Sequence, residues 1–443
     1  MNTAKAPSAG AAANPASQSI RISGLDRPWR EAESVVAIGP LQLPSVDDLR
    51  SAFVELAALG ARTRVGYTFD VEREQWLFDP ARLAELAEEA VTVIEAPPSA
   101  PDDTEQSVVA GLEKVLNSGS LPSHLPLLFE RSDTVLVQRQ NHAFGDAQSL
   151  LRLPGALVRV ATTGQLPKWV AEDLTAHPLW AALRNSIAPG RNPLAGLFRD
   201  RPTRGLQPHP ARLGEESGLV AWTPQLQVVF KAFSRSSWEA VQQWRRANAP
   251  AASMASVYVV LLRLALRQAG IQIATDTVVL YDCRRHLPAG AHVRGNFVIG
   301  RSQQFAEDPV SAGEEISETA HSARPLVTLI AATTKSSLVP PRPRATTVAK
   351  EPISVPAFVF PPRSGDLESM PWQRKDLRCL GTANAPSGPA DVTAALVMIS
   401  GRLSVSFTFH SNVLTEESIR EAARLMEDEP SSLLKAAVAS ARI

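Results

Sequence analysis

The sequence predicts a mixed α/β protein built from two lobes. Its 443 residues exceed the usual size of one domain, and 44% of them are hydrophobic, which is enough for two cores. Strand-like and helix-like patterns occur on both sides of 189–218, a segment rich in proline, glycine and arginine. We interpret this segment as a linker, although a basic surface loop has the same composition. We therefore expect a disordered tail at 1–19, an N-terminal lobe at 20–188 and a C-terminal lobe at 219–443.

The elements expected in the N-terminal lobe follow from hydrophobic spacing and capping signals. Ser45 and Asp48 form a capping-box pattern that begins the first helix. Pro154 should bend the last helix of this lobe. The predicted strands are 34–38, 64–69, 127–130 and 134–138, and the predicted helices are 45–59, 80–90, 105–116 and 147–162.

The C-terminal lobe repeats this mixture of strands and helices. Ser236 and Glu239 form a second capping-box pattern, and Thr415 should cap the last helix. A Ser400-Gly401 turn between two apolar runs predicts a hairpin. The predicted strands are 226–232, 277–281, 295–300, 355–360, 394–399 and 403–409, and helices are expected from Ser236, at 253–269, from Asp308 and at 415–426.

Composition and motifs exclude several classes of protein. The formal net charge is zero, which disfavours nucleic-acid binding, and no apolar run is long enough to span a membrane. The two cysteines, Cys283 and Cys379, lack the spacing of a metal site or a disulfide framework, so we expect a cytoplasmic protein without a metal. Strands do not alternate with single helices, which disfavours a doubly wound nucleotide-binding sheet. The sequence also contains no glycine-rich phosphate loop and no Gly-x-Ser-x-Gly elbow.

The strongest functional signal is Asn141-His142-Ala143-Phe144-Gly145-Asp146, where a predicted strand ends in a loop. A neutral imidazole there can take a proton from an alcohol or amine while that group attacks an acyl carbon. An aspartate at this spacing can hold the local backbone by pairing with an arginine. Taken alone, the spacing also fits a surface histidine beside an unrelated capping aspartate.

Two further segments lie at predicted strand ends in the C-terminal lobe. Asp282-Cys283-Arg284 follows one strand, and Gly295-Asn296 begins the next. Arg284 could be a solvated surface residue, and Asp282 could equally be a turn residue. We interpret Asn296 as a residue that orders the backbone and Cys283 as a small buried side chain.

In this order, the segments at His142, Asp282 and Gly295 make the chain resemble the His-x-x-x-Asp acyltransferase superfamily. That group includes chloramphenicol acetyltransferase, the BAHD acyltransferases, polyketide-associated acyltransferases and the condensation domains of nonribosomal peptide synthetases. His142 and Asp146 match its signature pair, Arg284 its Asp-x-Arg segment, and Gly295-Asn296 its Gly-Asn segment. The resemblance covers most of the chain.

The chain departs from two branches of that superfamily. Condensation domains usually carry two adjacent histidines and a glycine after the aspartate, where this chain has Asn141 and Ala147, with a glycine at Gly145 instead. The Asp-Phe-Gly-Trp-Gly segment of plant BAHD enzymes has no counterpart near Asp376 to Gly381. The resemblance is therefore greatest to a free-standing bacterial acyltransferase.

The resemblance implies two chloramphenicol-acetyltransferase-like lobes arranged in a V around a central tunnel. His142 would be the general base at mid-tunnel, and Asp146 would face away from the tunnel and pair with Arg284. Gly145 is a candidate oxyanion donor through its backbone N–H. The donor would be a thioester of coenzyme A or of phosphopantetheine on an acyl or peptidyl carrier protein, with a hydroxyl or amine acceptor and no permanently bound cofactor. We expect a monomer that acts in specialised metabolism.

Other interpretations stay open. The altered flanks Asn141 and Ala147 also fit a non-catalytic module that binds a carrier protein or an acyl product. A third possibility is another reaction of a carrier-bound intermediate, such as cyclisation or dehydration. Arg342, Arg344 and Lys350 form either a solvated basic loop or a phosphate contact. For His124, His286 and His410 we expect ordinary structural roles.

Overall fold

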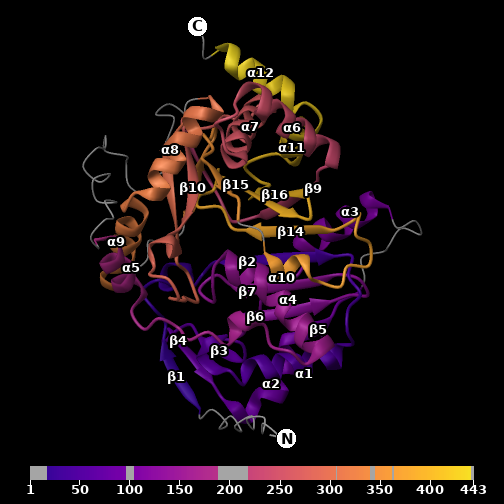
Figure 1. Ribbon diagram of the computed structural model, residues 1–443, viewed down its shortest axis with the longest axis vertical. Helices are drawn as coiled ribbons and strands as arrows, with labels where there is room; N and C mark the ends of the chain where they lie inside the picture. Colours follow the sequence, from indigo (N-terminus) through magenta and orange to yellow (C-terminus); the bar gives the residue numbers. More distant parts are fainter. Residues whose placement is uncertain are drawn as a thin grey trace, which may run out of the picture.

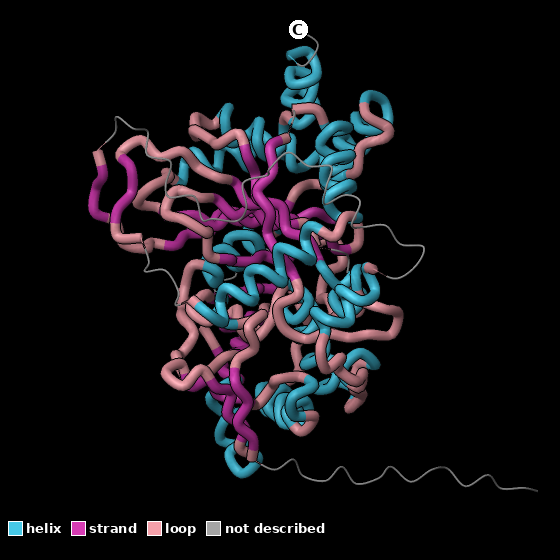
Figure 2. Tube along the Cα trace, turned by 90° about the vertical axis from the view of Figure 1, so that its left-hand side faces the viewer, coloured by secondary structure: helices cyan, strands magenta, loops and turns pink. Residues whose placement is uncertain are grey.

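The computed structural model describes residues 17–95, 104–187, 218–305, 307–339, 345–361 and 364–440. Two large sheets form the centres of two halves, one below the other in Figure 1. Seen from the side, most strands lie in the middle of the molecule with helices around them (Figure 2). The predicted linker, apart from Gly218, and residues 1–16 of the predicted tail lie outside the described residues.

The N-terminal half is built on a five-stranded sheet. Its order is β14 (Cys379–Asn384), β2 (Glu33–Gly39), β7 (Leu136–Asn141), β6 (Leu127–Arg131) and β5 (Val91–Val93). Buried apolar side chains of three helices, α1 (Val46–Ala57), α2 (Leu83–Ala90) and α4 (Ala147–Thr163), pack in one core with this sheet. A second, three-stranded sheet joins β1 (Gln18–Arg21), β4 (Gln75–Phe78) and β3 (Tyr67–Asp70).

The C-terminal half is built on a six-stranded sheet. Its order is β11 (Val298–Gln304), β10 (Asp276–Asp282), β13 (Pro356–Val359), β15 (Val392–Ile399), β16 (Arg402–His410) and β9 (Leu226–Ala232). The helices α6, α7, α11 and α12 gather at the upper end of this half (Figure 1). The helices of this half are α6 (Arg235–Asn248), α7 (Met254–Gln268), α8 (Pro309–His321), α9 (Arg324–Leu338), α11 (Glu416–Asp428) and α12 (Pro430–Ser440).

Smaller elements complete the described chain. β8 (Leu219–Ala221) and β12 (Thr347–Ala349) form a two-stranded ribbon, and α10 (Gly365–Glu368) lies against α4. Although α5 (Pro178–Ser186) precedes the predicted linker, it packs against α9 of the C-terminal half.

The two halves share β14, which the sequence analysis did not predict. β14 comes from the predicted C-terminal lobe but pairs antiparallel with β2, with Cys379 opposite Gly39. Its backbone also receives support from the other sheet, because the Ser406 hydroxyl accepts a hydrogen bond from the Thr382 N–H at 2.9 Å. In Figure 1, β14 accordingly lies between β2 and the pair β16 and β9. The division of the chain at 189–218 therefore does not separate the two sheets.

Local sequence signals explain several element boundaries. The capping box of Ser45 and Asp48 is present in full. The predicted strand at 64–69 begins only at Tyr67, because Arg64 has a φ of 61° and Gly66 a φ of 79°, which no strand accommodates. The capping box predicted at Ser236 is wrong, since Ser234 caps α6 by accepting from the Ser237 N–H.

No helix in the described part of the chain is both long enough and apolar enough to cross a membrane. Within the same residues, histidine, cysteine and carboxylate side chains form no group of three or more that could hold a metal ion. Cys283 and Cys379 are both buried and unpaired.

Candidate active site

His142 follows directly on β7, and the loop 142–146 leads into α4. Its backbone N–H donates to the Ala32 carbonyl at 2.7 Å. The Asn141 side chain fixes the loop on both flanks, because its Nδ2 donates to the Arg30 carbonyl at 2.7 Å and its Oδ1 accepts from the Ala143 N–H at 2.9 Å. Asn141, at the place where condensation domains usually carry a histidine, therefore orders the backbone here.

The imidazole of His142 is half-buried and stacks on an indole ring. Its partner is Trp29 of the 3₁₀ turn η1 (Arg27–Trp29), with ring centroids 4.3 Å apart and ring planes 17° from parallel. Its Nδ1 is buried and has no hydrogen-bond partner among the described residues. Burial lowers the pKa of His142 below its usual value, and the negative charges of Asp146 and Asp26 only partly oppose this. The ring is therefore neutral near pH 7 and available as a base.

Asp146 joins the two halves of the molecule. Its Oδ1 caps α4 by accepting from the Gln148 N–H at 3.0 Å, and its Oδ2 accepts from Nη1 of Arg284 at 2.8 Å. The same Oδ2 accepts from the Phe297 N–H at 3.1 Å. Asp146 is buried, and Arg284 comes from the 3₁₀ turn η6 (Cys283–His286) after β10. We call this ion pair the front clasp; it is the contact that the sequence resemblance implied.

A second ion pair, which the sequence analysis missed, holds the same loop. Asp26, with only 1% of its surface exposed, accepts from Nη2 of Arg64 at 2.9 Å. Nη1 of Arg64 in turn donates to the carbonyls of Ala143 and Phe144 at 3.1 and 3.0 Å. We call this pair the rear clasp. The sequence signal that could have indicated Asp26 is its spacing from Ser23, whose hydroxyl accepts from the Asp26 N–H and donates to its carboxylate.

Asn296 connects the rear clasp to the histidine. Its Nδ2 donates to the His142 carbonyl at 2.8 Å and to Oδ1 of Asp26 at 3.0 Å. Its backbone N–H donates to the same Oδ1 at 2.9 Å. These contacts are to the backbone and to a carboxylate, and the role of Asn296 in ordering the loop stays a prediction.

Gly145 lies where a side chain would not fit. A Cβ at this position would be 2.2 Å from the Ser149 hydroxyl oxygen. The Gly145 carbonyl accepts from Nε2 of Gln140 at 2.7 Å, and Gln140 is a buried residue of β7 that the sequence analysis did not identify. The role of the Gly145 N–H as an oxyanion donor stays a prediction.

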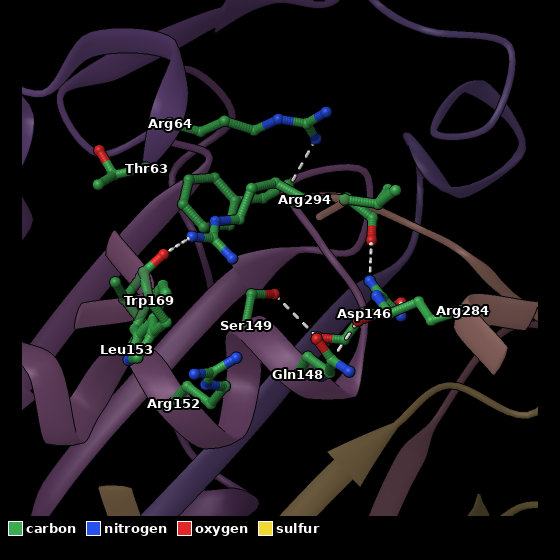
Figure 3. A pocket seen from close by; sticks show the side chains of 13 residues that line it. Thr63, Arg64, Asp146, Gln148, Ser149, Arg152, Leu153, Trp169, Arg284 and Arg294 are labelled. Atoms are coloured by element: carbon green, nitrogen blue, oxygen red, sulfur yellow. Dashed lines mark hydrogen bonds and ion pairs between the residues drawn. The ribbon is translucent and has the colours of Figure 1, made fainter. Parts of the chain in front are cut away.

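A hollow lies beside the front clasp, and Figure 3 shows the side chains around it. We call it the arginine hollow. Its lining includes Arg64, Arg152, Arg284, Arg294, Asp146 and Trp169. His142 is not among the residues that line it. The loop 142–146 therefore contributes Asp146 to the arginine hollow while the ring of His142 contacts Trp29.

The remaining predicted residues lie apart from this loop or contribute no reactive group. Burial raises the pKa of the Cys283 and Cys379 thiols to about 12, so neither is poised as a nucleophile. His124 is exposed beside Glu89, His286 is buried with Nδ1 3.3 Å from the Ser186 hydroxyl, and His410 accepts from the Gln225 N–H. Lys350 is exposed, and Arg342 and Arg344 lie outside the described residues.

Comparisons with known proteins show the fold. No family model matches the sequence, and no curated protein matches it. The first condensation domain of the calcium-dependent antibiotic synthetase matches with a TM-score of 0.53 at 16% identity, over 93% of this chain and 95% of that chain. The chain has the condensation-domain fold.

Two other solved structures share this condensation-domain fold. The cyclization-docking bidomain of a synthetase from Sorangium cellulosum matches with a TM-score of 0.53 at 10% identity, over 94% of this chain and 85% of that chain. The epimerization domain from the third module of tyrocidine synthetase B matches with a TM-score of 0.51 at 13% identity, over 96% and 98%. At these identities the likeness establishes the architecture, and the chemistry has to be argued from the site.

Proposed function

We propose that this protein is an acyltransferase that moves an acyl group from a thioester to a hydroxyl or amine, with His142 as the general base. The observation that carries the proposal is the state of His142: a half-buried imidazole with a lowered pKa, on a loop that residues of both halves hold in place. A neutral imidazole can accept the proton of the acceptor as its oxygen or nitrogen attacks the thioester carbonyl.

The residues around His142 suit this reaction. The front and rear clasps fix the loop backbone through carboxylates and carbonyls, and fixed geometry is what an in-line attack requires. In this scheme the Gly145 N–H would stabilise the developing oxyanion, and the thiolate would leave with the proton that His142 has taken up. Asp146 and Arg284 would be positioning residues, since their contacts are with each other, with Asp282 and with the backbone.

The donor would be acyl-coenzyme A or an acyl group on the phosphopantetheine of a carrier protein. The similarity to domains of peptide synthetases supports a carrier-bound thioester and a place in natural-product biosynthesis. We further propose that the two halves form the V of this fold, with a tunnel that brings donor and acceptor to His142 from opposite faces. The protein would work as a cytoplasmic monomer.

Single-turnover transfer, followed by intact-mass spectrometry, tests the proposal. The protein is mixed with acyl-coenzyme A pools or acyl-loaded carrier proteins and a panel of alcohols and amines. His142→Ala should lower the transfer rate by about 100-fold or more, whereas His124→Ala, which changes an exposed histidine beside Glu89, should leave it unchanged. Equal rates for His142→Ala and the wild-type protein would rule out the base role.

A second candidate is another reaction of a carrier-bound intermediate. The match to a cyclization-docking bidomain and to an epimerization domain motivates it, because both share the fold of this chain. The masses of the products separate the two candidates: acyl transfer adds the acyl mass to the acceptor, cyclisation with dehydration removes water from the carrier-bound chain, and epimerisation changes no mass. A binding module would retain the loaded carrier and release no product.

A further inference from the structure

The arginine hollow has a lining that proton transfer by His142 does not account for. Arg64, Arg152, Arg284 and Arg294 line it, and Asp146 is the only carboxylate among the lining residues. The other carboxylates paired with these arginines, Asp26, Asp282 and Asp366, are not among the lining residues. Four arginine side chains therefore border the space beside a single carboxylate.

Two of these arginines are held in place by one indole ring. The guanidinium carbon of Arg152 lies 4.5 Å from the ring centroid of Trp169, and that of Arg294 lies 4.7 Å from it. Trp169 is itself buried, and Asp366 accepts from its Nε1 at 3.3 Å and from Nε of Arg152 at 3.1 Å. The two cations are thus oriented before any ligand arrives, which lowers the entropy cost of binding one.

Arg294 is the least neutralised of the four. Its hydrogen bonds go to the backbone carbonyls of Arg62 and Trp169, and it forms no ion pair with any described residue. Burial, together with the positive charge of Arg152, lowers the pKa of Arg294 to about 10. A negative charge in the arginine hollow would offset the free-energy cost of burying the positive charge of Arg294.

We propose that the arginine hollow binds a phosphate group. The donors that surround it come from different elements: Arg152 and Ser149 from α4, and Arg294 from the loop before β11 (Figure 3). A tetrahedral group with three terminal oxygens can meet donors from several directions, whereas a planar carboxylate is satisfied by one guanidinium. The phosphate could be free inorganic phosphate or a phosphate ester of coenzyme A. This proposal does not depend on acyl transfer.

Calorimetric titration of the full chain with inorganic phosphate at low salt tests it. We expect saturable binding at one site, weakened at least about tenfold by Arg294→Gln and by Arg152→Gln. Arg235→Gln, which removes an exposed arginine of α6, is the matched control and should bind as the wild-type protein does. No saturable binding to the wild-type protein, or full affinity in both hollow variants, would overturn the proposal.

The source of the phosphate is then assigned by competition. If coenzyme A displaces inorganic phosphate and loses affinity in Arg294→Gln, the hollow takes a phosphate of the ester; if it binds without displacing phosphate, the hollow takes the free anion. Should Arg294→Gln fail to fold, Arg152→Gln and Arg294→Lys, which keeps the charge, still test the site. His142→Ala should bind phosphate normally, so a failure of this proposal is distinct from a failure of the proposed acyl transfer.

Discussion

The two ends of the loop 142–146 lie in contrasting environments. At one end the half-buried imidazole of His142 stacks on Trp29 and has a lowered pKa. At the other end, Asp146 lies among guanidinium groups at the edge of the arginine hollow. The comparison shows how a base can stay neutral close to several charges: the charged groups bind the loop's carboxylate and carbonyls, and the ring itself contacts an aromatic side chain.

Breaking the front clasp should give the largest effect on stability. Arg284→Gln leaves Asp146 as a buried charge without its partner, and we expect it to lower the free energy of unfolding by about 3–5 kcal/mol, measured by urea denaturation. Arg235→Gln is again the control, because its ion pair with Glu239 is exposed. Adding Asp146→Asn to Arg284→Gln should recover part of the loss, and a double variant no more stable than Arg284→Gln alone would contradict this account.

Breaking the rear clasp should cost less than breaking the front clasp. After Arg64→Gln, Asp26 keeps donors from the Ser23 hydroxyl and from both nitrogens of Asn296, so we expect a loss of about 1.5–3 kcal/mol. The same urea denaturation series measures it. A cost above that of Arg284→Gln would mean that the rear clasp is the main support of the loop.

Removing the hydrogen bond from Gln140 to the Gly145 carbonyl should lower the stability by less than breaking either clasp. Gln140→Leu leaves the Gly145 carbonyl without its side-chain donor, which we expect to cost about 1–2 kcal/mol of stability and to slow acyl transfer by loosening the loop. Gln140→Glu keeps the shape of the side chain but lacks the amide N–H that donates to the Gly145 carbonyl. It should therefore not restore the rate of acyl transfer. Unchanged transfer in Gln140→Leu would show that the loop keeps its geometry without this bond.

Exposing the ring of His142 should have the smallest effect of these changes. It should appear in the pH dependence of the transfer rate. The base form must be neutral, so with a lowered pKa the midpoint of the acidic decline in transfer rate should lie below pH 6.5. Trp29→Ala admits water to the ring, so the pKa should rise toward 6.5 and the acidic decline should begin at higher pH than in the wild-type protein. A profile of Trp29→Ala that coincides with that of the wild-type protein would show that the stacking does not control the pKa.

Local spacing in the sequence reveals part of the candidate site. His142 and Asp146 stand four residues apart at a strand end, and the order of Arg284 and Asn296 after them marked the resemblance. Local spacing did not predict Asp26, Arg64 or Gln140, because each acquires its role from a partner that only the tertiary fold brings near. Asp26 accepts from Asn296, and Arg64, from another loop, donates to the carbonyls beside His142.

The secondary structure was likewise predicted where local signals are strong and missed where they are weak. Helices with clear caps, such as α1 from Ser45 and α11 from Thr415, were predicted close to their observed bounds. β14 was missed because its short run Cys379–Asn384 carries no strong pattern and is stabilised by β2, far away in the sequence. The helix α9 was missed as well, since Arg324 and Pro325 open it without any side-chain cap.

The protonation of His142 is the central claim, and nuclear magnetic resonance measures it most directly. Histidine labelled with ¹⁵N is followed through a pH titration, and the signal of His142 is assigned by its absence in His142→Ala. We predict a neutral imidazole with a pKa below 6.5, shifted upward in Trp29→Ala. A pKa at or above 6.5 in the wild-type protein would contradict the account, because burial of the ring would then not disfavour its charged form.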